Sequence, residues 1–252
     1  MVGASSITAV YGAIGDKRIV PRKRAGENGD GEMGGKLIVF EGVEGCGKTT
    51  QLHATQNWLQ ASGVSLMAPI VVSREPGGTE LGLGLRRLLL EGHRHPICDR
   101  AELFMYAADR VQHIEEVLNP HLSAGGIILC DRYTDSTVAY QGYGRGLSQT
   151  LITQLNYLAT LGLESDLTLW LDVDVEIGLA RARSRGAADR IEQADLAFHR
   201  RVQQGYTELA QAYPDRIVRV DASRSVVEVQ AQIQEILQEQ FRQWHQTHSL
   251  PC

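Results

Sequence analysis

The chain has 252 residues, of which 43% are hydrophobic, and its formal net charge is -5. A chain of this length and composition can bury one sizeable core, so we expect one α/β domain. The acidic balance argues against a broad DNA- or RNA-binding surface, because non-specific affinity for nucleic acid comes from clustered lysine and arginine side chains. A small anionic substrate is still allowed, since a few local arginines can bind it.

The cysteine content and the short apolar runs bear on the compartment. The four cysteines have spacings that match neither a zinc site nor a paired disulfide framework. The longest apolar runs, such as residues 127–130, are far shorter than the roughly 20 residues that span a bilayer. We therefore expect a soluble protein in a reducing cytoplasm, with no membrane partner.

Residues 1–32 differ in composition from the rest of the chain. They are rich in glycine, alanine and serine, contain a basic cluster, and lack the hydrophobic periodicity of a packed element. We interpret them as a disordered extension or as an over-long start, in which case Met33 is the natural beginning. An organelle-type transit peptide is an alternative, whereas a secretory signal is not expected because no A-x-A cleavage site follows a solid apolar stretch.

From Lys36 onward, short runs rich in β-branched residues alternate with longer amphipathic stretches. Strands are expected at 37–41, 70–73, 127–131, 167–172 and 217–220, and helices at 49–61, 101–122, 149–161 and 196–213. A last helix carries one apolar stripe, made by Val229, Ile233, Ile236, Leu237 and Phe241. This alternation predicts a three-layer α/β fold with a five-stranded parallel sheet and crossover helices on both faces.

A phosphate-binding loop follows the first predicted strand. The pattern G-x-x-x-x-G-K-[ST] is satisfied by Gly42, Val43, Glu44, Gly45, Cys46, Gly47, Lys48 and Thr49. Glycines let backbone N–H groups curl around phosphates without Cβ clashes, and the following helix N-terminus adds partial positive charge. We assign this stretch and Thr50 to a nucleoside triphosphate site, where Lys48 reaches the β and γ oxygens and the Thr49 hydroxyl binds Mg²⁺.

A second element of such a site is expected at the end of the strand at 127–131. The strand ends in Asp131, and the carboxyl ends of strands face the ligand crevice in open α/β sheets. We therefore expect Asp131 to join Thr49 at the metal ion.

A phosphate-binding loop alone does not separate GTPase switches, motors and small-molecule kinases. The guanine-reading motif N-K-x-D is absent downstream, which counts against a GTPase switch, and no helix-turn-helix or basic stripe indicates a nucleic-acid motor. Two alternatives stay open on these grounds. One is a kinase for another nucleotide or nucleoside, and the other is a non-catalytic, nucleotide-dependent switch or scaffold.

Four further segments make the chain resemble the thymidylate kinases. Residues 74–79 read R-E-P-G-G-T, residues 131–133 read D-R-Y, residues 136–142 read S-T-V-A-Y-Q-G, and residues 181–192 are similar to the arginine-rich lid of the bacterial form. The resemblance implies a P-loop nucleoside-monophosphate-kinase domain at 33–246, followed by a tail at 247–252. It also implies the reaction of MgATP with dTMP to give ADP and dTDP, in dTTP synthesis, and a homodimer formed through the helix at 101–122 and its neighbours.

The acceptor phosphate carries about two negative charges, so its site needs fixed cations. Arg74 and Arg132 each lie just past a predicted strand end and are the best candidates. Glu44 is an acid inside an anion-binding loop, where it repels phosphate unless it has another partner. The resemblance implies that Glu44 accepts a hydrogen bond from the sugar 3′-hydroxyl of dTMP.

The base pocket is assigned by resemblance. Tyr106 occupies the position whose ring stacks on thymine, and Arg110 the position that donates to the base edge. Tyr140 matches the aromatic residue that crowds the sugar C2′ position, so it is expected to disfavour ribonucleotides. The rest of the expected substrate site consists of Ser136, Thr137 and Gln141.

The lid segment is expected to supply a catalytic cation. Its basic side chains are Arg181, Arg183, Arg185 and Arg190, whereas positions 43–46 of the phosphate-binding loop contain no lysine or arginine. Phosphoryl transfer depends on positioning and on stabilising the charge of the transferred group. The chain resembles those thymidylate kinases in which a lid arginine acts as a finger in cis, and the sequence leaves open which of the four arginines does so.

Overall fold

The computed structural model describes residues 34–62, 68–91, 95–184 and 189–248. Its centre is one parallel sheet made of β1 (Lys36–Glu41), β2 (Ile70–Arg74), β3 (Ile127–Asp131), β4 (Leu167–Asp172) and β5 (Ile217–Asp221). The strands lie in the order β2-β3-β1-β4-β5, and every neighbouring pair is parallel. The predicted five-stranded parallel sheet is therefore confirmed.

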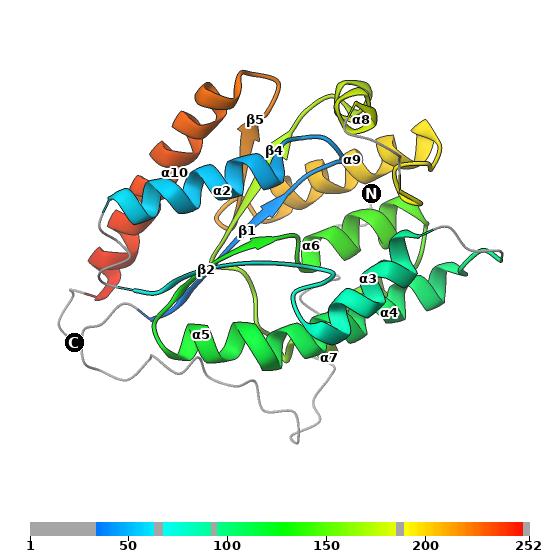
Figure 1. Ribbon diagram of the computed structural model, residues 1–252, viewed down its shortest axis with the longest axis horizontal. Helices are drawn as coiled ribbons and strands as arrows, with labels where there is room; N and C mark the ends of the chain where they lie inside the picture. Colours follow the sequence, from blue (N-terminus) through cyan, green and yellow to red (C-terminus); the bar gives the residue numbers. More distant parts are fainter. Residues whose placement is uncertain (1–33, 63–67, 92–94, 185–188, 249–252) are drawn as a thin grey trace.

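Helices cover both faces of this sheet (Figure 1). They are α2 (Lys48–Ala61), α3 (Glu80–Leu90), α4 (Asp99–His113), η2 (Ile114–Leu118), α5 (Asn119–Ser123), α6 (Thr134–Thr137), η3 (Val138–Gly144), α7 (Gln149–Thr160), α8 (Val175–Arg183), α9 (Leu196–Ala212) and α10 (Val226–His248). α2 and α10 pack together on one face, and α4, α5 and α9 lie on the other. This is the predicted three-layer arrangement.

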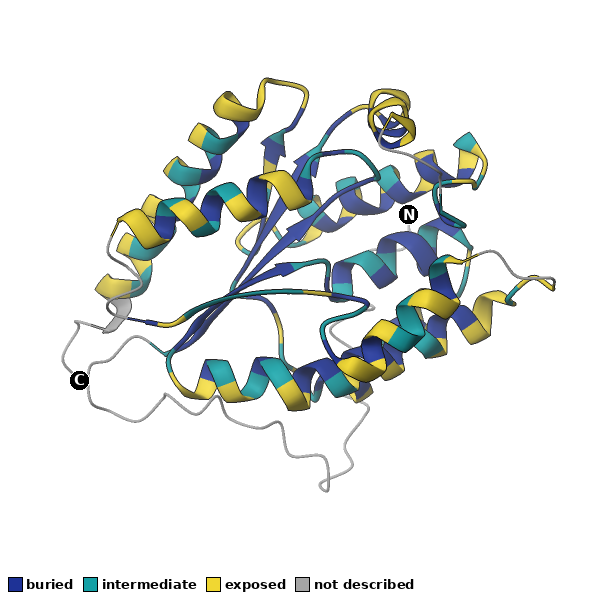
Figure 2. Cartoon of the chain, in the orientation of Figure 1, coloured by how far each residue is buried: buried dark blue, intermediate teal, exposed yellow. Residues whose placement is uncertain are grey.

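The alternation of side chains along β1 shows how both faces are filled. Ile38 and Phe40 belong to the large apolar cluster that includes Leu52 of α2. Leu37 and Val39 point the other way and belong to a second cluster with residues of η2 and α5. These four side chains are completely buried. In Figure 2, β1 is buried along its length, whereas the edge strand β2 is mostly intermediate. Burial on both faces explains why the strand reads as a continuous apolar run.

The helix predicted at 101–122 exists but is not uniform. It begins at Asp99, and its hydrogen-bond pattern widens to a π-helical turn at η2, where the Asn119 N–H donates to the Ile114 carbonyl. Pro120 follows directly at the start of α5. Because proline has no N–H and clashes with the preceding turn, the helix accommodates it by this local change of pitch.

Three helical segments had no counterpart in the prediction, namely α3, the pair α6 and η3, and α8. The pair α6 and η3 and the helix α8 are short, and α3 contains Gly82 and Gly84. All three border the edge of the sheet to which the strands point.

Among the described residues, no helix combines the length and the apolar character that crossing a bilayer requires. The extension predicted at 1–32 and Arg185 lie outside the described residues. The last helix continues to His248, past the boundary predicted at 246, and the remainder of the tail also lies outside them.

Candidate active site

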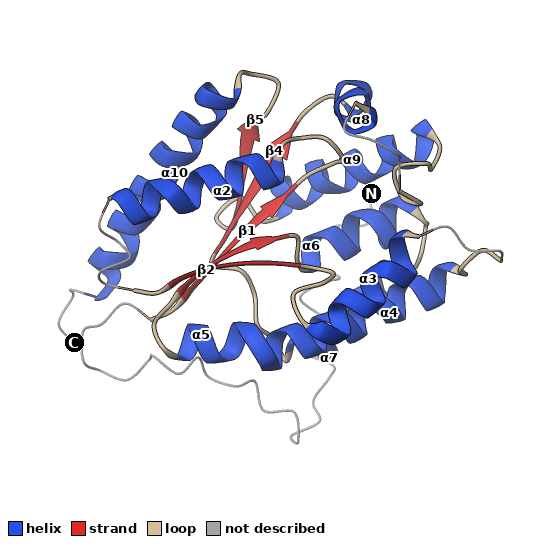
Figure 3. Ribbon diagram, in the orientation of Figure 1, coloured by secondary structure: helices blue, strands red, loops and turns tan. Residues whose placement is uncertain are grey.

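The phosphate-binding loop joins β1 to α2 at the edge to which all five strand arrows point (Figure 3). Gly42, Gly45 and Gly47 have φ values of 143°, 69° and 97°, which L side chains rarely adopt. Lys48 Nζ donates to the carbonyl oxygens of Gly42 at 3.0 Å and Val43 at 3.1 Å, so its charge lies inside the loop. The loop is therefore shaped to receive phosphate oxygens at the N-terminus of α2.

The two oxygen groups predicted to bind a metal ion lie beside this loop. The Thr49 hydroxyl donates to Asp131 Oδ2 at 3.3 Å, across from the end of β3. Mg²⁺ prefers oxygen ligands and is commonly held by one or two protein groups together with substrate phosphates and water. The predicted metal-binding pair, Thr49 and Asp131, is thus brought together by the fold and has the right chemistry for Mg²⁺.

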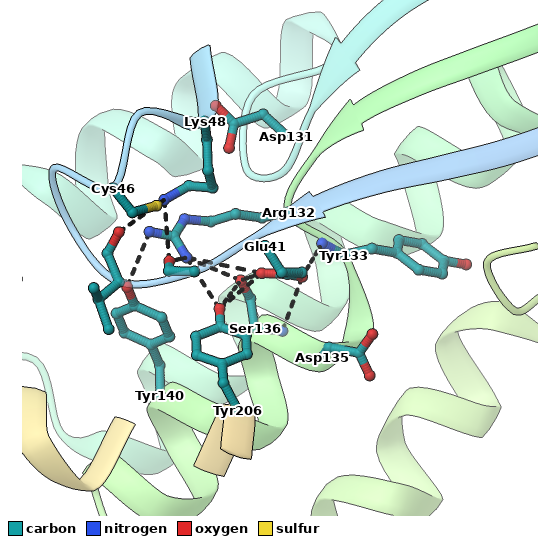
Figure 4. Close-up of polar contacts among 12 residues, drawn as sticks. Glu41, Cys46, Lys48, Asp131, Arg132, Tyr133, Asp135, Ser136, Tyr140 and Tyr206 are labelled. Atoms are coloured by element: carbon teal, nitrogen blue, oxygen red, sulfur yellow. Dashed lines mark hydrogen bonds and ion pairs between the residues drawn. The ribbon is translucent and has the colours of Figure 1, made fainter. Parts of the chain in front are cut away.

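Arg132 lies at the centre of the site (Figure 4). Its Nη2 donates to Glu44 Oε1 at 2.6 Å and to the Tyr140 hydroxyl at 2.9 Å. Its Nη1 donates to the Gly42 carbonyl at 3.1 Å, and its guanidinium carbon is 4.7 Å from the centre of the Tyr140 ring. Arg132 has a φ of 72°, an uncommon conformation for a residue with a side chain. The fold therefore holds the guanidinium between the phosphate-binding loop and η3.

This arrangement explains why an acid is tolerated in the phosphate-binding loop. Burial alone raises the pKa of Glu44, but the charges of Arg132 and Lys48 and the hydrogen bond from Tyr140 outweigh it and hold the pKa at about 2. Glu44 is therefore ionised at neutral pH, and its charge is compensated by the protein before any ligand binds.

Two pockets meet at Arg132. The first lies over the phosphate-binding loop, and its wall includes Lys48, Thr49, Thr50, Arg74 and Asp131. The second brings together Tyr106, Arg110, Ser136, Thr137, Tyr140 and Gln141, which are the side chains assigned to the base and sugar. The residues that line both pockets are Glu44, Glu75, Arg86, Arg132 and Asp189. We call this set the shared wall.

All three nitrogens of the Arg110 guanidinium donate hydrogen bonds to the protein itself. Its side chain is 2% exposed, and its Nε donates to Glu75 Oε2 at 2.8 Å. Its Nη1 donates to Asn156 at 2.7 Å, and its Nη2 donates to the Thr137 hydroxyl at 3.0 Å. Gln141 is also held, because its Nε2 donates to the buried carboxylate of Glu102 at 2.8 Å. The polar floor of this pocket is therefore fixed before a ligand enters.

Arg86 of α3 is a further site residue that was not predicted from the sequence. Its Nη1 donates to the Pro76 carbonyl at 2.9 Å, and the side chain belongs to the shared wall, whereas Arg74 lines only the first pocket. A local signal for α3 was present in the sequence. Thr79 is followed by an acid and then by an apolar stretch, and its hydroxyl accepts from the Gly82 N–H at 3.0 Å, as a helix N-cap does.

Helix α8 packs directly on the phosphate-binding loop. A Cβ at Gly45 would lie 1.9 Å from the Gly178 carbonyl oxygen, and a Cβ at Gly178 would lie 2.4 Å from that of Glu44. Any side chain at Gly45 or Gly178 would thus push α8 away from the loop. The close approach places Ala182, near the end of α8, on the wall of the pocket over the loop.

The three lid arginines that the structure describes occupy different surroundings. Arg181 Nη1 donates to the Ala222 carbonyl at 3.0 Å. Arg190 Nε donates to the Leu89 carbonyl at 2.7 Å, and its Nη2 pairs with Glu102. Arg183 is exposed at the end of α8. Arg185 lies outside the described residues. The structure therefore gives other partners to Arg181 and Arg190, which are two of the four candidates for the finger.

Comparisons with known proteins agree on one family. The sequence model of the family described as thymidylate kinase matches residues 40–233. A thymidylate kinase of Nostoc punctiforme is 67% identical over 207 residues, which cover 81% of this chain and 96% of the relative. One from a Cyanothece species is 57% identical, covering 84% of this chain and 97% of the relative. The crystal structure of thymidylate kinase from Ehrlichia chaffeensis superposes with a TM-score of 0.67 at 32% identity, covering 81% of this chain and 99% of that one.

The compensated charge of Glu44 predicts how stability depends on pH. Its pKa is about 2 in the folded protein against 4.5 for the free side chain, and each unit corresponds to about 1.4 kcal/mol. The carboxylate therefore contributes on the order of 3 kcal/mol to the free energy of unfolding above about pH 4.5, and this contribution is lost as the pH falls toward 2. Urea unfolding measures this. Between pH 6 and pH 3, the free energy of unfolding of Glu44→Gln is expected to fall less than that of the parent.

The matched control is Glu176→Gln. Glu176 and Arg200 form an ion pair in which both side chains are 62% exposed, and such pairs contribute only about 0–1 kcal/mol. This variant is expected to follow the parent curve. Parallel curves for the parent and Glu44→Gln would show that Glu44 is not held by Arg132 in solution.

Proposed function

The chain belongs to the thymidylate kinase family and transfers the γ-phosphoryl group of ATP to dTMP, and we propose that this transfer takes place across the shared wall. The products are ADP and dTDP, the precursor of dTTP. One observation carries the proposal: Arg132 lies between a pocket over a phosphate-binding loop and a pocket lined by the predicted nucleoside-binding side chains.

ATP would enter from the side of the phosphate-binding loop. Its phosphates would be wrapped by backbone N–H groups of the loop, with Lys48 turning from the loop carbonyls toward the β and γ oxygens. A further pocket on the other side of the loop, lined in part by Thr50, Arg181 and Ala222, is suited to the adenosine end. Mg²⁺ would be held by the Thr49 and Asp131 oxygens, and when bound it neutralises charge on the donor phosphates.

dTMP would occupy the second pocket with its phosphate at the shared wall. Arg132 and Arg86 are the cations of this wall, and guanidinium groups match phosphate oxygens in geometry and charge. Glu44 would accept the sugar hydroxyl, and the Tyr106 ring would stack on thymine. Arg74, which lines only the first pocket, would face the donor phosphates or the transferred group rather than the nucleoside.

The reaction needs little chemistry from the protein. An oxygen of the acceptor phosphate attacks the γ phosphorus, and the bond to the β-phosphate oxygen of ADP breaks. Positioning of the two phosphates and compensation of their mutual repulsion are the main contributions. Arg132 is suited to hold the acceptor, because the partners of Nη1 keep the guanidinium in place while Nη2 faces the nucleoside pocket.

One lid arginine would complete the site. Arg181 lies against the pocket proposed for the adenosine end, and Arg190 is held by Glu102. The remaining candidates are Arg183 and Arg185. The packing of α8 on the loop at Gly45 supports a finger delivered from the end of this helix.

A homodimer in the cytoplasm is the assembly that we propose. Exposed apolar side chains follow one stripe of α4, at Phe104 and Val111, and another of the adjacent α7, at Leu151 and Leu158. Exposed apolar side chains gathered on two packed helices are typical of a protein interface. The cysteines that the structure describes are free thiols, which supports a reducing compartment.

The function is tested with a coupled ADP-release assay over a panel of nucleoside monophosphates. We expect selective turnover of dTMP, with dUMP slower and ribonucleotides poor. Lys48→Ala is expected to abolish turnover while leaving the circular dichroism spectrum and the unfolding temperature near those of the parent, since Lys48 acts on phosphates rather than on the core.

Lys36→Ala is the control for that variant. Lys36 begins the same strand, at its other end, and pairs with Asp166 at 3.6 Å. This variant is expected to retain turnover. Near-normal turnover by a folded Lys48→Ala would rule out the proposed phosphate site, and a stronger preference for another monophosphate would rule out dTMP as the substrate.

Tyr140 is expected to set the preference for deoxyribose. Its ring is 6% exposed and lines the second pocket, while its hydroxyl donates to Glu44 at 2.8 Å. Tyr140→Ala is expected to lower the ratio of kcat/KM for dTMP over the thymine ribonucleotide, because it makes room beside C2′. Tyr140→Phe keeps the ring, so it is expected to lose activity without losing this preference. An unchanged ratio in the alanine variant would exclude Tyr140 as the gate.

The lid arginines are tested by four single alanine variants. We expect Arg183→Ala or Arg185→Ala to lower kcat by roughly 10³, on the order of 4 kcal/mol of transition-state stabilisation, by analogy with arginine fingers. dTMP affinity, measured by calorimetry without ATP, is expected to change little. If all four variants keep kcat within about threefold of the parent, or if the losses appear only in dTMP binding, no lid arginine acts as a finger.

A further inference from the structure

Glu41 is a buried acid beside the active site that reaches neither of the two pockets. It is the last residue of β1, directly before the phosphate-binding loop, and it is 0% exposed. Burial raises the pKa of this carboxyl, with Arg132 and two hydroxyl groups acting in the opposite direction. A buried carboxylate costs several kcal/mol unless hydrogen bonds and opposite charge offset the cost. The partners of Glu41 therefore indicate what it does.

All four hydrogen-bond partners of Glu41 come from segments that surround Arg132 (Figure 4). Oε1 accepts from the backbone N–H groups of Tyr133 at 2.9 Å and Ser136 at 3.1 Å. Oε2 accepts from the Ser136 hydroxyl at 2.6 Å and the Tyr206 hydroxyl at 2.7 Å. The two N–H groups belong to the start of α6, where a helix has no carbonyl partners of its own. Glu41, at the end of β1, thus caps the start of α6 and fixes the backbone directly after Arg132.

The same two hydroxyls connect Glu41 to the guanidinium. Arg132 Nη1 donates to Ser136 Oγ at 3.1 Å and to the Tyr206 hydroxyl at 3.2 Å, and it lies 3.9 Å from Glu41 Oε2. An ionised carboxylate only accepts hydrogen bonds, so it draws the single proton of each hydroxyl toward itself. The lone pairs of both hydroxyls then face Arg132. The charge state of Glu41 therefore sets the direction of these bonds.

The guanidinium has two sides with different surroundings. Nη1 is bound by the Gly42 carbonyl and the Tyr206 hydroxyl, which do not line the nucleoside pocket, and by the Ser136 hydroxyl, which Glu41 holds at the wall of that pocket. Nη2 is bound by Glu44 and Tyr140, both of which line that pocket. A phosphate that arrives in the pocket competes for the Nη2 side. The Nη1 side keeps its partners and can hold the group in place during that exchange.

We propose that Glu41 is a positioning residue for phosphoryl transfer, which orients Arg132 toward the acceptor phosphate through Ser136 and Tyr206. The proposal rests on the function given above, in which Arg132 binds that phosphate. Glu41 touches no substrate. It fixes an arginine whose backbone, at φ 72°, is in a conformation that costs on the order of 1–3 kcal/mol and needs support from its surroundings.

Glu41→Gln tests the proposal. Glutamine has the same shape and keeps one carbonyl oxygen for the two backbone N–H groups. Its amide nitrogen replaces Oε2 by a donor, so the Ser136 and Tyr206 hydroxyls must turn their protons away from residue 41 and toward Arg132. Calorimetry measures the affinity for dTMP and for thymidine, which has the same base and sugar but no phosphate. We expect dTMP to bind about tenfold more weakly, with kcat lowered by about tenfold or more, while thymidine and ATP affinities stay within about threefold.

Two further variants separate orientation of Arg132 from general support of the fold. Asp135→Asn alters another buried carboxylate of α6, which pairs with Arg216 at 2.6 Å and points away from the cluster in Figure 4. It is expected to lower the unfolding temperature without changing the ratio of dTMP to thymidine affinity. Tyr206→Phe removes one hydroxyl and keeps three of the four bonds of Glu41, so it is expected to change that ratio in the same direction as Glu41→Gln by about threefold.

The outcomes are distinguishable. The proposal is overturned if Glu41→Gln weakens dTMP and thymidine equally, or if it leaves both unchanged. If Glu41→Gln does not fold, Tyr206→Phe decides, and an unchanged ratio in that variant overturns the proposal. A parent protein that binds dTMP no better than thymidine, or that does not phosphorylate dTMP, would contradict the proposed function instead.

Discussion

An arginine enclosed between two pockets must meet two opposing requirements. Its charge has to be compensated by the protein, and its N–H groups have to remain usable by a phosphate. Arg132 meets both because its two terminal nitrogens have separate sets of partners. Glu44 faces the pocket and can exchange its bond to Arg132 for one to a substrate, whereas Glu41 is enclosed and cannot. Three features of the fold compensate or position this one cation. They are the acid within the phosphate-binding loop, the short helix α6 and the hydroxyl of Tyr206 on α9.

The parallel sheet brings these groups together. In the register of β1, β2 and β3, Asp131 lies opposite both Phe40 and Arg74. The ends of these three strands therefore lie side by side, and the chain leaves each of them at the same edge of the sheet. Donor phosphate, metal ligands and acceptor cation then lie within a few residues of a strand end, as is general for ligand sites of open α/β sheets. Residues distant in sequence meet there without long or irregular loops.

Much of this could be predicted from the sequence because the relevant signals are local. The phosphate-binding loop is one contiguous motif, and each strand is an apolar run that ends in a polar residue. The misses have physical causes. Arg86 lies on a helix that was not predicted, and nothing local distinguishes it from its neighbour Arg87. Glu41 reads as an ordinary strand end, because its partners are far away in sequence and only the fold shows that they surround Arg132. The π-helical turn before Pro120 can be identified only from the hydrogen-bond pattern of the folded chain.

The central claim is that Arg132 couples the pocket side of the site to its enclosed side. A double-mutant cycle with Glu44→Gln and Tyr206→Phe tests it most directly, because Glu44 and Tyr206 contact different nitrogens of Arg132. The measured quantity is kcat/KM for dTMP in the parent, both single variants and the double variant. We expect the double variant to differ from the sum of the single effects by about 1 kcal/mol, as for residues that share a partner. Additive effects, within about 0.3 kcal/mol, would contradict the account.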